Sequence, residues 1–209
     1  MPLSARWRVV CNLLLAGVIL YAWARMTFVV QSGALTATGA ANLKYYTVLS
    51  NLLAAGASVF YCAAAVSGRG VAAAERVKFV AAVTISITFL VVVAFLGPLF
   101  GYATMFTGPN FWFHLAAPLA CVAECALWGR PPRRIKGVLW ALLPLAVYGV
   151  CYLANVIING PGEWPNVNDF YGFATWGVPV GVALFGVLLG VAFCVGLALR
   201  ATGRRRIEE

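Results

Sequence analysis

Six long apolar segments dominate this chain of 209 residues and decide what it can fold into. They cover residues 9–30, 43–66, 77–100, 111–128, 138–158 and 174–199. Each is close to the ~20 apolar residues that one helical crossing of a bilayer requires. None shows the alternation of apolar and polar residues that is typical of membrane barrel strands. The sequence therefore predicts an all-α, polytopic protein: a single membrane domain over residues 1–209, built as a bundle of six transmembrane helices.

The distribution of charge predicts how this bundle is oriented. Only 10% of the residues are charged and 63% are apolar, which excludes a soluble enzyme or a nucleic-acid-binding module. Thirteen of the 15 basic residues fall on one side of the predicted bundle: Arg6, Arg8, Arg69, Arg76, Lys78, Arg130, Arg133, Arg134, Lys136, Arg200, Arg204, Arg205 and Arg206. Because short basic loops remain cytoplasmic, both termini are predicted to be cytoplasmic, and the net charge of +9 needs no nucleic-acid partner.

Several standard catalytic and metal-binding patterns are missing from the sequence. The six cysteines all fall in the apolar segments, and no paired CxxC motif, HExxH motif, phosphate-binding glycine loop or Gly-x-Ser-x-Gly elbow occurs. We therefore expect no metal and no cofactor. Ala22-Trp23-Ala24 has the form of a signal-peptidase site, but the apolar run continues beyond it and favours a first helix that is retained.

A polar face opens the second apolar segment. Helical spacing places Lys44, Thr47 and Asn51 on roughly one face, with Ser50 beside them. One interpretation is structural, because hydroxyls can bond back to carbonyls one turn earlier and an asparagine can pack helices together. The other is that these side chains form part of a site at the outer end of the helix.

The fourth segment contains His114, the single histidine of the chain, one turn inside its outer end. Pro118 has no N–H to give to the carbonyl of His114, so the helix is expected to kink there. Thr47 and His114 lie about three residues inside their helices, or ~5 Å of helix rise, and so at matching depth. A neutral imidazole at this depth could activate the threonine hydroxyl as a nucleophile, or it could simply be satisfied by a backbone carbonyl.

Together, Lys44-Tyr45-Tyr46-Thr47 and His114-x-x-x-Pro118 with Glu124 resemble the androgen-induced-protein-like family of six-span membrane proteins. The motif order and the six-span plan extend this resemblance over most of the chain. It implies a threonine hydrolase of fatty-acid esters of hydroxy fatty acids, with Thr47 as nucleophile and His114 as base. The 12 arginines against three lysines suggest a small microbial member, in a bacterial plasma membrane, that takes its lipid substrate from the bilayer.

The remaining candidates concern substrate and oxyanion binding. Arg25 could receive a fatty-acid carboxylate or extend toward phosphate headgroups, and Asn51 or Asn155 could donate to a developing oxyanion. Glu124 lies too deep to orient His114 and is expected to pair with Arg130 or another basic neighbour. The outer loop 159–173 could be a lid or an interfacial loop anchored by its aromatic residues.

Three functions therefore follow from the sequence as hypotheses. The first is an intramembrane lipid-ester hydrolase, the second a lipid-binding or scaffolding protein without turnover, and the third a small-solute transporter. The hydrolase requires that the second and fourth helices be neighbours. The transporter requires a polar path that reaches both membrane faces, whereas the polar candidates gather at one end. The oligomeric state does not follow from the sequence.

Overall fold

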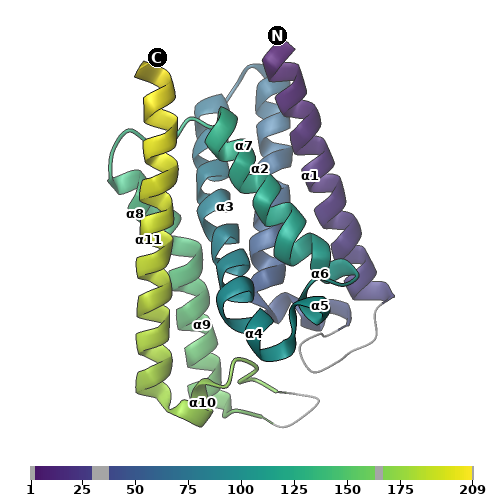
Figure 1. Ribbon diagram of the computed structural model, residues 1–209, viewed down its shortest axis with the longest axis vertical. Coiled ribbons are helices and arrows are strands. Elements are labelled where there is room, and N and C mark those ends of the chain that lie inside the picture. The colour runs from purple at the N-terminus through teal and green to yellow at the C-terminus, as the bar shows by residue number, and fades with distance from the viewer. Residues whose placement is uncertain (1–2, 30–37, 163–166, 209) are drawn as a thin grey trace.

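The computed structural model describes residues 3–29, 38–162 and 167–208. In this part of the chain, six helical stretches are long and apolar enough to span a membrane: Arg6–Phe28, Tyr46–Ser67, Val71–Phe100, Pro109–Trp128, Lys136–Asn159 and Val178–Gly203. The first of them begins, and the last ends, at the same end of the bundle (Figure 1). We call this the basic end and the opposite one the outer end. The structure confirms the predicted all-α class with six candidate membrane-spanning helices.

The spans are divided into the following elements. The first two are α1 (Leu3–Phe28) and α2 (Tyr46–Ser67), with the 3-10 helix η1 (Gly39–Lys44) before α2. The third comprises α3 (Val71–Val91), a π-helical turn η2 (Val92–Leu96) and α4 (Gly97–Phe100). After α5 (Tyr102–Met105), the fourth comprises α6 (Pro109–Phe111), a second π-helical turn η3 (Trp112–Ala116) and α7 (Ala117–Trp128). The last two are α8 (Lys136–Ala141) with α9 (Leu143–Asn159), and α11 (Val178–Glu208), which follows α10 (Phe173–Trp176).

The helices form a four-helix unit with a helix pair beside it. Figure 1 shows α1, α2, α3 and α7 packed together, while α9 and α11 run along one side of this unit next to α3. Side chains such as Ile19, Val48, Ile85 and Phe113 fill the core between the four helices. Fully buried alanines such as Ala54 let the helix backbones approach closely, which favours packing inside a membrane.

Each π-helical turn lies just before a proline. Pro98 and Pro118 cannot donate to the carbonyl four residues earlier, so the ladder of hydrogen bonds is interrupted at both places. The Gly97 N–H bonds instead to the Val92 carbonyl, and the Ala117 N–H to the Trp112 carbonyl, five residues earlier in each case. The irregularity expected at Pro118 is thus a widened helical turn. Such turns occur often at functional sites.

Four charged side chains are buried together near the basic end: Arg8 on α1, Glu75 and Lys78 on α3, and Glu124 on α7. The Arg8 guanidinium donates to both oxygens of Glu75, at 2.5 and 2.9 Å, and its Nε donates to Glu124 at 2.6 Å. The Lys78 Nζ lies 3.2 Å from the other oxygen of Glu124. Two positive and two negative charges therefore neutralise one another away from water. We call this group the ion network.

Neutral side chains complete the ion network and bring in α2. Asn12 donates to Glu124 at 3.1 Å, and Ser58 on α2 accepts from Lys78 at 3.1 Å. The ring of Tyr61, also on α2, lies 4.1 Å from the Arg8 guanidinium carbon, within the range of a cation–π interaction. The network therefore joins all four helices of the main unit.

Helices α1 and α3 extend beyond the predicted apolar segments on the basic side. Helix α1 begins at Leu3, before the segment 9–30, and α3 begins at Val71, before the segment 77–100. The added turns carry Arg8 and Glu75, which pair with each other in the ion network. Glu124 was expected to pair with Arg130 or another basic neighbour, and it pairs instead with Arg8 and Lys78, which are distant in sequence.

Replacing Arg8 should destabilise the bundle strongly. The change Arg8→Met removes the cation that Glu75 and Glu124 share and leaves Glu75 without an ion-pair partner in the described residues, so we expect a loss of about 3–5 kcal/mol in the free energy of unfolding. Unfolding by SDS in mixed micelles measures this loss. The matched control is Arg6→Met, because Arg6 is exposed on the same helix, and its effect should be below ~0.5 kcal/mol. Equal stabilities of the two variants would contradict a structural role for the network.

Candidate functional site

Asn51 connects the second and fourth spans at the outer end. Its side chain is fully buried, and its amide nitrogen donates to the Thr47 carbonyl at 2.8 Å and to the Phe113 carbonyl at 3.1 Å. One nitrogen thus bridges the residue at the head of α2 and the residue directly before His114. The segments that carry Thr47 and His114 are therefore neighbours, which is the arrangement that the hydrolase hypothesis requires.

His114 is buried in the π-helical turn η3, and its Nδ1 lies 2.8 Å from the carbonyl oxygen of Met105. A carbonyl can only accept, so Nδ1 carries the proton. In the neutral ring, Nε2 then keeps its lone pair. Nε2 has no hydrogen-bond partner among the residues that the structure describes. The imidazole is therefore held in the tautomer that a general base needs.

The hairpin between the third and fourth spans supplies this carbonyl. Gly101 and Gly108 both have positive φ, +85° and +58°, and let the chain reverse tightly on either side of α5. The Tyr102 hydroxyl donates to the Val93 carbonyl in the π-helical turn η2, at 2.8 Å, which fastens α5 to the third span. Met105, at the end of α5, is buried. The two π-helical turns and the hairpin between them thus form one unit around His114.

Thr47 and Ser50 on α2 differ in burial and in their hydrogen-bond partners. Ser50 is buried, bonds back to the Thr47 carbonyl at 3.0 Å, and lies 2.8 Å from the Thr88 hydroxyl of α3. Thr47 is half-buried, and within the described residues its hydroxyl has no hydrogen-bond partner. The Thr47 hydroxyl is thus free to act, whereas Ser50 packs α2 against α3.

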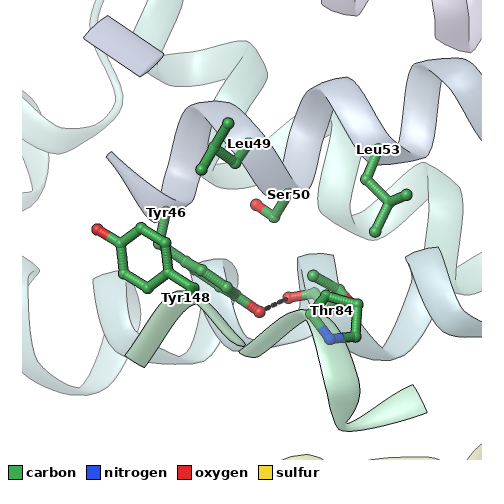
Figure 2. A pocket seen from close by; sticks show the side chains of 7 residues that line it. Tyr46, Leu49, Ser50, Leu53, Thr84 and Tyr148 are labelled. Atoms are coloured by element: carbon green, nitrogen blue, oxygen red, sulfur yellow. Dashed lines mark hydrogen bonds between the residues drawn. The ribbon is translucent and has the colours of Figure 1, made fainter. Parts of the chain in front are cut away.

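A small crevice lies on the Ser50 side of α2. It holds about 60 Å³ and is lined by Tyr46, Leu49, Ser50, Leu53, Thr84, Pro144 and Tyr148 (Figure 2). The Tyr46 hydroxyl closes one wall by donating to the Thr84 carbonyl at 3.0 Å. This volume is far below the range of about 300–1,000 Å³ that is usual for ligand sites, so the crevice is too small for an acyl chain. Thr47 and His114 are not among its lining residues.

Lys44 belongs to the outer loop rather than to the Thr47 region. Its Nζ donates to the Val167 carbonyl at 3.2 Å and lies 5.4 and 5.3 Å from the rings of Tyr45 and Phe170. Burial raises the pKa values of Tyr45 and Tyr171, so both phenols are neutral where they pack.

Asp169 fastens the same loop to α9. It accepts from the Tyr152 hydroxyl at 2.5 Å and from the Phe173 backbone N–H at 2.8 Å. These contacts, in the described residues 167–173, agree with the interpretation of a loop anchored by aromatic side chains. Glu163, which was expected in this loop, lies outside the described residues.

Arg25 and Asn155 are not joined to the site by any contact in the described part of the chain. Arg25 is exposed in the last turn of α1. The Asn155 side chain accepts from Asn159 at 2.8 Å, one turn further along α9. Asn51, the other oxyanion candidate, donates from its amide nitrogen to two carbonyls. Its buried Oδ1 has no hydrogen-bond partner within the described residues. In this arrangement Asn51 holds two helices together and presents an acceptor, not a donor.

Sequence patterns did not identify the Met105 carbonyl as the hydrogen-bond partner of His114. A backbone acceptor carries no residue-type signal, and only the two glycines around α5 and the proline after His114 indicate an unusual turn. The bridging role of Asn51 could be inferred only in outline, because a buried asparagine on a membrane helix can pair with any neighbouring helix.

No protein-family model, no curated protein and no solved structure matches this chain.

The tautomer of His114 can be measured directly, because the chain has a single histidine. We expect the ¹⁵N spectrum of protein labelled at histidine to show a protonated Nδ1 and an unprotonated Nε2 at neutral pH. A ring protonated at Nε2 alone would contradict the bond to Met105. As a control, the His114→Gln variant should lose both signals.

The bridge made by Asn51 should also contribute to stability. The change Asn51→Leu keeps the volume but leaves the buried Phe113 carbonyl without this donor, so we expect a loss of about 1–3 kcal/mol in the free energy of unfolding. Asn155→Leu is the matched control and should change it by less than ~0.5 kcal/mol. An unchanged SDS midpoint for Asn51→Leu would show that the bridge is unimportant.

Proposed function

We propose that this protein is an intramembrane hydrolase of lipid esters that uses Thr47 as nucleophile and His114 as base. The observation that carries the proposal is the Asn51 bridge, because it brings the head of α2 next to the turn that holds His114. The free hydroxyl of Thr47 and the free Nε2 of His114 add the two chemical groups that the reaction needs.

In the first half of the reaction, the Thr47 hydroxyl attacks the ester carbonyl while Nε2 of His114 takes its proton. The tetrahedral intermediate then expels the alkoxide, which receives that proton from Nε2. The alcohol leaves, and the acyl group remains bound to Thr47. The bond between Nδ1 and Met105 keeps the ring in one orientation throughout, and the carbonyl helps to stabilise the transient imidazolium.

In the second half, water attacks the acyl-threonine ester with His114 again acting as base. Collapse of this intermediate returns the proton to Thr47 and releases the fatty acid. Neither half of the reaction requires a metal or a cofactor.

The position of the site favours a lipid substrate. Thr47 is the second residue of α2 and His114 is the sixth residue of the fourth span, so both lie near the outer end. The ester group of an amphiphile rests at this level with its chains in the bilayer. The resemblance to the androgen-induced-protein-like family suggests fatty-acid esters of hydroxy fatty acids or similar esters. The basic residues at the opposite end favour an orientation with the site in the outer leaflet. The 12 arginines against three lysines favour a bacterial plasma membrane.

The described interior of the bundle weighs against a transporter. Between the level of His114 and the ion network, the buried residues of α2 and α7 include Ala54, Ala55, Ala117 and Cys121, which are apolar. On α3, the buried hydroxyls of Thr84 and Ser86 donate to carbonyls of their own helix. A scaffolding protein that binds lipid without turnover is the remaining alternative, and activity measurements separate it from a hydrolase.

Removing the nucleophile should abolish activity. Purified protein in detergent should hydrolyse a long-chain ester, and both Thr47→Ala and His114→Ala should lower kcat by at least about 10³-fold, as expected for groups that act as a unit. Thr47→Ser keeps a hydroxyl and should retain part of the activity. The measurement is the release of fatty acid, followed by mass spectrometry.

The matched control is Thr202→Ala, since Thr202 is exposed at the basic end. A covalent hydrolase probe should label the wild-type protein and this control, but not Thr47→Ala. Undiminished turnover by Thr47→Ala would exclude the proposed nucleophile. Lipid binding without turnover or labelling would favour the scaffold.

A further inference from the structure

The fifth span bends where α8 meets α9, and the bend opens a groove on the outside of the bundle. Helix α8 ends at Ala141 and α9 begins at Leu143, with Pro144 in its first turn. The groove holds about 450 Å³ and is lined by Lys136, Leu139, Trp140, Leu142, Leu143 and Ala146. This volume lies within the range of about 300–1,000 Å³ that is usual for ligand sites.

The opposite face of α8 is already occupied. Val138 is fully buried, and it packs so closely on Gly196 of α11 that a Cβ on this glycine would lie 2.7 Å from the Val138 side chain. Helix α8 is therefore fixed to the bundle, and its groove faces outward, toward the lipid.

The groove has a positive charge at its end nearest the basic end. Lys136 is exposed at the start of α8, two residues after Arg134, which is exposed like Arg133 before it. The carboxylates with described side chains, Glu75, Glu124 and Asp169, are all buried elsewhere. No ion pair in the described part of the chain involves these three cations. This end of the groove therefore complements an anion.

The rest of the groove is apolar and matches a hydrocarbon chain. Leu139 and Leu143 are 52% and 49% exposed, and Trp140, at 67%, lies one turn after Lys136 on the same face of α8. Tryptophan and lysine are typical of the level where headgroups meet hydrocarbon. An inorganic anion would use the cations and leave this apolar surface uncovered, whereas a lipid would use both.

We propose that this groove binds one anionic phospholipid of the inner leaflet. The phosphate pairs with Lys136, the indole of Trp140 lies at the glycerol level, and the upper part of one acyl chain follows Leu139, Leu143 and Ala146. The site is separate from Thr47 and His114, because it lies at the basic end of the bundle, and it does not depend on the hydrolase.

The probe is phosphatidylglycerol in competition with phosphatidylcholine. The full-length protein is inserted into nanodiscs with equal amounts of the two lipids, and native mass spectrometry counts the lipids that it retains after release. We expect wild-type protein to retain phosphatidylglycerol preferentially. Lys136→Ala should lower this retention about fivefold, the effect of one cation at a membrane surface, and Lys136→Glu should lower it further.

Three controls separate this site from general charge attraction. Arg69→Ala removes another exposed cation of the basic end, between α2 and α3, and should leave retention unchanged. Leu143→Trp fills the groove with Lys136 intact and should lower retention, which tests the acyl chain. Millimolar inorganic phosphate should not displace the lipid.

Three results would overturn the proposal. They are equal retention of both lipids by the wild-type protein, equal loss in Lys136→Ala and Arg69→Ala, and displacement of the lipid by inorganic phosphate. Helix content measured by circular dichroism verifies that each variant is folded, and because Lys136 and Leu143 are exposed, their substitution should not disturb the core.

Discussion

The ion network near the basic end is the interaction on which the rest of the bundle depends. A lipid environment cannot solvate Arg8, Glu75, Lys78 or Glu124, so each must find its partners inside the protein. These partners come from four helices, and their short bonds fix the rotation and depth of each helix. At the outer end, a different contact holds the head of α2 next to the His114 turn: the Asn51 side chain, which donates to the carbonyls of Thr47 and Phe113.

The sequence predicts the architecture well because the signal is physical and local. Runs of about 20 apolar residues require helices in a bilayer, and six such runs give the observed spans. Helices α1 and α3 extend beyond the apolar runs, and the added turns carry Arg8 and Glu75. Whether Arg8 lies outside the membrane or inside a neutralised cluster depends on Glu75, 67 residues away in sequence. No local pattern contains this information.

The candidate site was likewise predictable from the sequence only in part. Thr47 and His114 could be selected from their depth and from short motifs, and the structure brings their segments together through Asn51. The carbonyl of Met105 that orients the ring could not be foreseen, since it depends on how the hairpin folds. Lys44, Ser50 and Asn155 were polar residues at a suitable level, but their contacts belong to the loop, to α3 and to α9. Residues at the same depth in a helix bundle need not face the same site.

The composition of the ion network also determines the order in which this protein can be assembled. Arg8, Glu75 and Lys78 belong to the first three spans, while Glu124 is the last member to leave the ribosome. Until the fourth span is inserted, the first three hold one more cation than anions in the network, and Lys78 has no counter-charge. The charges of the network therefore balance only when the fourth span is present.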